Sequence, residues 1–298
     1  MFRRPRALLS CAGLSLLAAT ALSAAATESP EQAWPTATPI KHLVIIFGEN
    51  ESFDHYFATY PHALNPRDEP AFVAGADTPP INGLDTALLE HNPNASAAAN
   101  GLNKSNPFRL DRSQANTEDQ THSYTPEQLA YDHGAADLFP RYTGNNTVSS
   151  TAAFGTRGLV MGYFDGNTVT ALWNYAQHFA MSDNTYTDTY GPSTPGALEV
   201  VAGTNNGAVP RVGHAEVIAD TQGGYTLIGD TDPAGDVCSS AASQVSTRFL
   251  HIGNLLNDRH VSWGGFTGGF DLERINEEGR TSCTGTSYSG VRGESKTE

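Results

Sequence analysis

Five consecutive apolar residues, 43–47 (LVIIF), constrain the fold of this chain more than any other feature of its sequence. A short run of branched and aromatic side chains that ends at a glycine, here Gly48, is typical of a strand buried on both faces of a parallel sheet. The residues that follow carry side-chain oxygen atoms: Glu49, Asn50, Ser52 and Asp54. Ligands of open α/β sheets bind just beyond the carboxyl ends of the strands, so this segment is a candidate metal or oxyanion site. A polar turn after a core strand is the alternative.

The first 26 residues have the layout of a secretory signal peptide. Arg3, Arg4 and Arg6 precede an apolar run, and small residues then lead to a predicted cleavage site after Ala26. The apolar run is short for a membrane span, and no second run of that length follows. We therefore expect a secreted or periplasmic protein with no integral membrane segment after cleavage, exported by the general or the twin-arginine route.

The chain is strongly acidic, with a formal net charge of −15. Cleavage of the signal peptide would remove three arginines and no acid, and so would make this charge more negative. Such a protein is poorly suited to nucleic acid, and we expect no nucleic-acid partner. The two cysteines that remain after cleavage are Cys238 and Cys283, and an even pair in an exported chain favours a disulfide.

Beyond the predicted signal peptide, the composition divides the chain into three segments. Residues 27–40 form a Pro- and Thr-rich, extended lead-in, residues 41–285 one domain, and residues 286–298 a polar, disordered tail. Within the domain, residues 92–106 are so rich in Asn, Ala and Ser that we predict a mobile segment.

Several helices and strands are predicted from periodicity and turn signals. The capping-box pattern 125–128 predicts a helix over about 126–138, and apolar spacing predicts a second over about 168–181. The helical spacing is carried by Leu172, Tyr175, Ala176 and Phe179, and the core assignment is made for Trp173, Tyr175 and Phe179. Further helices are expected at 195–201 and near 248–257, and strands at 225–228 and 261–263. This alternation favours an α/β architecture.

Ser193 is the leading candidate nucleophile. It lies in the sequence Gly-Pro-Ser-Thr-Pro-Gly, 191–196, in which glycine and proline favour a tight turn before a helix. The free N–H groups and the dipole at a helix start can hold a phosphoryl oxygen and lower the pKa of a serine hydroxyl. The alternative is that Ser193 or Thr194 simply caps the helix.

His122 is the second candidate catalytic residue. It stands directly before a predicted helix, where an imidazole could donate to a phosphate oxygen or protonate a leaving group. A packed or surface histidine is the alternative. Asp183, Asn184 and Asp188 precede the Ser193 turn and are interpreted as a solvated loop.

Four motifs in chain order resemble the bacterial and plant phosphoesterase family, which includes secreted phospholipases C, acid phosphatases and plant non-specific phospholipases C. They are ENESFDHYF at 49–57, THS at 121–123, MGYFDGN at 161–167 and GPSTP at 191–195. The resemblance covers about residues 40–270.

The resemblance implies an α/β, alkaline-phosphatase-like three-layer sandwich with a mostly parallel central sheet. It further implies that Glu49 and Asn50 bind a divalent metal ion or the phosphate, that Ser193 is the nucleophile and a ligand of the metal, and that His122 contacts phosphate. The substrate would be a phospholipid or a small phosphate ester. A sulfatase or phosphonate hydrolase is disfavoured, because no Cys-x-Pro-x-Arg-like motif surrounds the predicted nucleophile.

The sequence departs from the family pattern after Cys283. The family continues there with a His-containing motif and an acidic pair that completes the metal site, and this sequence has neither. We therefore expect a sandwich that is incomplete at the C-terminus, and weak or no hydrolysis of phosphate esters by residues 27–298. A catalytically inactive fragment or a binding-only relic is the alternative to an active enzyme.

Overall fold

The structure is a computed structural model that describes residues 36–145, 153–235, 239–240 and 242–266. Contacts divide the chain into two units, Met1–Phe47 and Gly48–Glu298. The predicted signal peptide, the predicted tail and the predicted disulfide between Cys238 and Cys283 lie outside the described residues. No helix in the described ranges is long and apolar enough to cross a membrane.

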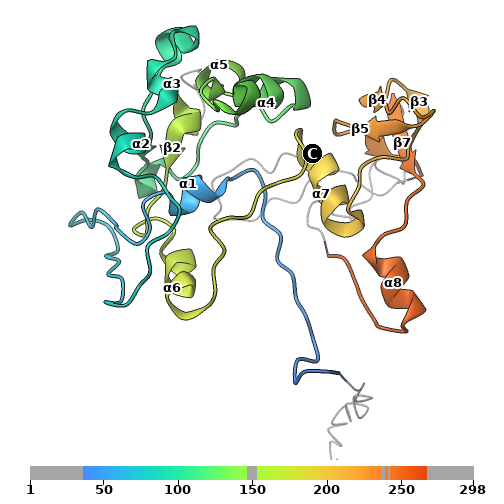
Figure 1. Cartoon of the computed structure of the whole chain (residues 1–298), viewed down its shortest axis with the longest axis horizontal. Helices are drawn as coiled ribbons and strands as arrows, with labels where there is room; N and C mark the ends of the chain where they lie inside the picture. The colour runs from blue at the N-terminus through green and yellow to red at the C-terminus, as the bar shows by residue number, and fades with distance from the viewer. Residues whose placement is uncertain (1–35, 146–152, 236–238, 241, 267–298) are drawn as a thin grey trace, which may run out of the picture. The chain divides into compact units, whose positions relative to one another are not determined.

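The described part of the first unit, residues 36–47, contains neither helix nor strand and runs as an extended trace (Figure 1). The prediction of a buried strand at 43–47 is wrong for this structure: all five side chains are exposed, and Ile46 retains 92% of its accessible surface. A strand in a parallel sheet becomes buried only when neighbouring strands and covering helices pack on it. None of the described strands pairs with this run.

The second unit mixes short helices with small sheets (Figure 1). The α-helices of its described residues are α1 (Phe53–Phe57), α2 (Thr86–Glu90), α3 (Pro93–Ser96), α4 (Tyr124–Tyr131), α5 (Phe139–Tyr142), α6 (Thr170–His178), α7 (Ser193–Ala202) and α8 (Ile252–Asp258). The strands are β1 (Phe108–Arg109), β2 (Gly162–Tyr163), β3 (Ala208–Gly213), β4 (Val217–Ala219), β5 (Tyr225–Leu227), β6 (Asp232–Pro233) and β7 (Ser243–Thr247).

Three separate sheets form from these strands. β1 and β2 pair in parallel, β4 and β5 pair antiparallel, and β7 lies between antiparallel β3 and parallel β6. The mixed α/β class is therefore confirmed. The described residues contain no large parallel sheet, and the alkaline-phosphatase-like sandwich stays a prediction.

The predicted elements are recovered best where local signals are strong. α7 and β5 confirm the helix at 195–201 and the strand at 225–228, and α8 falls within a few residues of its prediction. α4 begins at Tyr124 and ends early because Asp132 adopts a left-handed conformation, and its N-cap, Ser123, makes no side-chain capping bond. The predicted strand at 261–263 is irregular.

Trp173 is the centre of one hydrophobic core. Its side chain is fully buried, its ring meets those of Tyr60 and Phe72 edge to face at 5.2 and 5.0 Å, and its Nε1 donates to the Tyr56 carbonyl. Ala176 is partly buried and packs against this core, but the predicted burial of Tyr175 and Phe179 is wrong. Tyr175 and Phe179 are exposed, because α6 is buried on the side that carries Trp173.

Residues 92–106 are ordered, and the prediction of a mobile segment is wrong. They contain α3 and a 3-10 helix (Ala98–Asn103), and the side chains of Asn92, Asn94 and Asn100 are buried. Asn94 donates to the Ala136 carbonyl at 2.9 Å and accepts from the Phe139 amide at 3.0 Å. These side chains therefore take the place that apolar residues usually fill, since each satisfies buried backbone groups.

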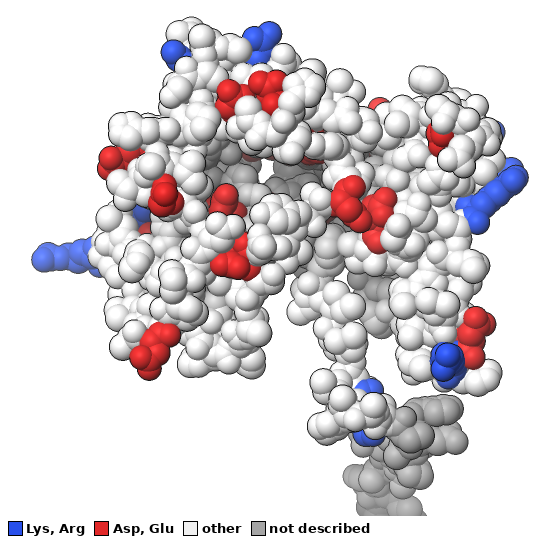
Figure 2. Space-filling model, viewed as in Figure 1, with Lys and Arg blue, Asp and Glu red and all other residues white. Residues whose placement is uncertain are grey.

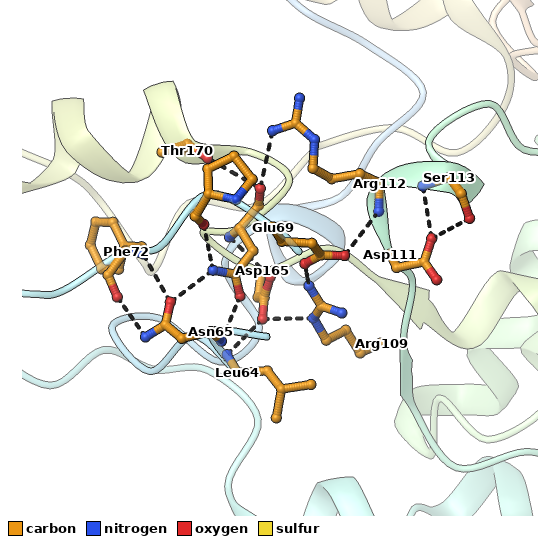
Figure 3. A network of polar contacts seen from close by, with 12 residues as sticks. Leu64, Asn65, Glu69, Phe72, Arg109, Asp111, Arg112, Ser113, Asp165 and Thr170 are labelled. Atoms are coloured by element: carbon orange, nitrogen blue, oxygen red, sulfur yellow. Dashed lines mark hydrogen bonds and ion pairs between the residues drawn. The ribbon is translucent and has the colours of Figure 1, made fainter. Parts of the chain in front are cut away.

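A second buried polar network joins the loop at 64–72 to the MGYFDGN motif (Figure 3). Asp165 accepts from Arg109 Nε and from the Leu64 amide, at 2.8 and 2.9 Å, and Arg109 also pairs with Glu69. Asn167 is fully buried and donates to the Pro70 carbonyl. The MGYFDGN motif therefore holds the loop at 64–72 in place through buried polar contacts. We call Asp165, Asn167, Arg109 and Glu69 the clasp.

The charge distribution on the visible face agrees with the acidic composition. Figure 2 shows Lys and Arg side chains that are few and separated, while carboxylates are spread over several parts of the surface. The described residues on that face therefore form no basic patch of the kind that binds phosphate backbones.

Candidate functional site

Ser193 opens α7, as its prediction requires. Pro192 is the N-cap residue in an extended conformation, and Gly191 before it has a φ of +113°. A side chain at position 191 would be strained by this backbone and would bring its Cβ to 3.1 Å from the Ile228 carbonyl oxygen. The turn that presents Ser193 therefore requires glycine at this position.

The start of α7 is capped by a carboxylate from a distant loop. Asp230, which follows β5, accepts a hydrogen bond from the Thr194 amide at 2.8 Å. We expected the amides at this helix start to be open to a phosphoryl oxygen. At Thr194 that expectation is wrong, because the Asp230 carboxylate already occupies the position that an anion would take.

Glu127 contacts the same turn from the other side. It lies on α4, and its Oε2 accepts a hydrogen bond from the Gly191 amide at 2.7 Å. Burial raises the pKa of the Glu127 carboxyl above its usual value of 4.5, although the Gly191 amide and nearby His122 both act in the opposite direction. The turn before α7 thus faces a half-buried carboxylate.

His122 lies two residues before α4 and is half-buried. The imidazole lies close enough to Glu127 to act on its carboxyl, whose pKa it lowers, and this carboxyl is the group that accepts from the Gly191 amide. Two tyrosines of α4, Tyr124 and Tyr131, also pack on Tyr190, with ring centroids 6.3 and 6.0 Å apart. The structure therefore brings the start of α4 to the turn that precedes Ser193.

Glu49 and Asn50 are exposed, and Asn50 has a left-handed backbone with φ of +64°. No hydrogen bond between described residues involves either side chain, and their convergence with Ser193 stays a prediction. The described part of the chain contains no group of three or more His, Cys, Asp or Glu residues that could hold a metal ion. The donors described in this structure therefore do not by themselves fit a divalent cation, which takes about six oxygen ligands.

Sequence reasoning missed two residues of this site, Glu127 and Asp230. Glu127 was included only in a capping-box pattern, although a glutamate in the first turn after a candidate histidine is a usable signal. No local pattern marks Asp230, which is 36 residues from Thr194.

Most of this chain matches a known protein family. The model of the phosphoesterase family matches residues 40–293, which is most of the chain and includes all four motifs, His122 and Ser193. The extent of this match confirms the predicted resemblance. This chain belongs to the phosphoesterase family.

Proposed function

We propose that this chain is a secreted hydrolase of phosphate esters, of the phospholipase C or acid phosphatase type, with Ser193 as its nucleophile. The observation that carries the proposal is the placement of Ser193 at the first position of α7, in a turn held on both sides, within a chain of the phosphoesterase family. A phospholipid or a small phosphate ester is the proposed substrate.

In the proposed reaction, the Ser193 hydroxyl oxygen attacks phosphorus and releases its proton to solvent water, and the bond from phosphorus to the ester oxygen breaks. His122 donates a proton to the leaving alkoxide. Water then hydrolyses the phosphoserine and releases phosphate or a phosphomonoester. A divalent cation, bound in part by Glu49 and Asn50, is the proposed cofactor, although the described donors do not assemble its site.

The test is an assay of the purified protein against p-nitrophenyl phosphate and p-nitrophenyl phosphocholine, each with and without a chelator. We expect at most weak turnover, which Ser193→Ala should abolish, and the preferred substrate would separate phosphatase from phospholipase C activity. Ser113→Ala, at an exposed position of the 3-10 helix Arg112–Gln114 in the same unit, is the matched control and should retain turnover. Equal rates for Ser193→Ala and the unaltered protein would contradict the proposal.

A catalytically inactive, binding-only relic is the second candidate. It is favoured by the exposure of Glu49 and Asn50 and by the lack of a three-residue ligand group in the described residues. No turnover of either ester under any condition, with or without added divalent metal, would favour this candidate.

A further inference from the structure

We propose that Glu127 and Asp230 are positioning residues that clamp the backbone on both sides of Ser193 and so fix the direction of its hydroxyl. The proposal rests on the proposed function only in taking Ser193 as the nucleophile. The clamp itself follows from two hydrogen bonds between segments that are far apart in the sequence.

The first arm of the clamp reaches the turn from α4. Glu127 accepts from the Gly191 amide across 64 residues of sequence. The packing of Tyr190 on Tyr124 and Tyr131 supports this contact, because it holds the residue before Gly191 against the same helix. A side chain at position 191 would meet the Ile228 carbonyl oxygen, so the turn passes close to the end of β5.

The second arm reaches the turn from the loop after β5. Asp230 accepts from the Thr194 amide, and Thr194 is the residue directly after Ser193. The neighbouring Thr231 is buried and accepts from the Glu216 amide through its hydroxyl, at 2.9 Å, which anchors the loop that carries Asp230. The position of Asp230 is therefore fixed by the contacts of the residue next to it, Thr231.

The two arms bracket the predicted nucleophile. One holds the amide two residues before Ser193 and the other holds the amide one residue after it, so the backbone between them has few alternative conformations. A nucleophile needs such a fixed direction, since a displacement of about 1 Å can lower a rate by about a hundredfold. Two carboxylates also disfavour an unaccompanied phosphate dianion at this turn.

The experiment compares Glu127→Gln, Glu127→Ala, Asp230→Asn and Asp230→Ala in the full chain. Gln and Asn keep an oxygen that can accept the amide hydrogen bond, whereas Ala removes it. Glu199→Gln is the matched control, because Glu199 also accepts from a backbone amide, that of Asn205, at 3.1 Å. The direct readout is residue-resolved hydrogen exchange of the Gly191 and Thr194 amides, with thermal unfolding as the check on folding.

We expect the Gly191 amide to exchange at least about tenfold faster in Glu127→Ala, and the Thr194 amide to do the same in Asp230→Ala, since each loses a charge-assisted hydrogen bond. Glu127→Gln and Asp230→Asn should retain most of the protection of these two amides against hydrogen exchange. In the ester assay, kcat should fall by about a hundredfold in each Ala variant with little change in KM.

Unchanged exchange of both amides in the Ala variants would overturn the clamp. So would an unchanged kcat in folded Ala variants of an active protein, because the clamp would then not position the nucleophile. If the unaltered protein shows no turnover but exchange responds as expected, the clamp stands and the proposed function is wrong. The exchange readout therefore separates the two proposals.

Discussion

Residues 92–106 and residues 43–47 relate composition to burial in opposite ways. The first segment is rich in asparagine, yet it is ordered and buries Asn92, Asn94 and Asn100. The second is entirely apolar, yet its five side chains are exposed. Average hydrophobicity would predict the opposite, namely that residues 43–47 are buried and residues 92–106 exposed.

The difference shows that burial depends on available partners. Asn100 donates to the carbonyls of Asn94 and Asp137, so one amide group serves two backbone acceptors in a confined space. An apolar strand cannot satisfy its own backbone in this way and becomes buried only inside a sheet. An asparagine side chain can itself hydrogen-bond nearby backbone groups, whereas an apolar strand needs neighbouring strands to pair with its backbone before it can be buried.

The largest effect that would sharpen this comparison is expected at Asp165, the most connected buried carboxylate of the clasp. Asp165→Ala leaves the Arg109 guanidinium with one partner fewer and the Leu64 amide with none between described residues. We expect a loss of about 3–5 kcal/mol in the free energy of unfolding, measured by urea denaturation. Asp77→Ala, at an exposed position, should change it by less than about 0.5 kcal/mol. A loss below about 1 kcal/mol at Asp165 would show that the clasp contributes little.

A somewhat smaller effect is expected at Asn94. Asn94→Ala removes the partners of the Ala136 carbonyl and the Phe139 amide, and each buried group left unsatisfied costs about 1–3 kcal/mol. The free energy of unfolding should fall by about 2–4 kcal/mol in total. Asn103→Ala is the matched control in the same segment, since its side chain makes no hydrogen bond to another described residue. Similar losses for the two variants would contradict the role of the buried asparagines.

The half-buried Glu127 should make stability depend on pH. Its pKa is raised in the folded protein, so the folded state binds more protons than the unfolded state between the usual value of 4.5 and the raised value. This contribution to stability is therefore complete below pH 4.5 and is lost as the pH rises through the raised pKa. Glu127→Gln should match the unaltered protein at low pH and become relatively more stable above this window, as thermal unfolding across pH would show. If Glu127→Gln instead became less stable than the unaltered protein as the pH rises, the pKa of Glu127 would be lowered by folding and not raised.

The smallest effect is expected at Ile46. Because this side chain is 92% exposed, Ile46→Ala should change the free energy of unfolding by less than about 0.5 kcal/mol. A buried strand would instead lose about 2–5 kcal/mol on the same change. Urea denaturation of this variant therefore decides between the exposed run in the structure and the strand predicted from the sequence. Val245→Ala, at a buried position of β7, is the comparison that should show a clear loss.

Several features were predictable because their signals are local. The glycine- and proline-rich turn before α7, the position of Ser193 at the helix start and the strand at Tyr225 depend on the conformational preferences of adjacent residues. The motifs also sufficed to identify the phosphoesterase family, which the match over residues 40–293 confirms. The helix lengths were less predictable, since the left-handed residue at Asp132 ends α4 without a glycine.

The sequence by itself determined the family, the mixed α/β class and the candidate nucleophile, because each depends on which residues stand next to one another. Only the tertiary structure decided which side chains are buried and what holds the Ser193 turn. Gly191 and Thr194 find their partners 64 and 36 residues away, in Glu127 and Asp230. Contacts at such separations depend on how the elements pack, and no pattern of neighbouring residues encodes them.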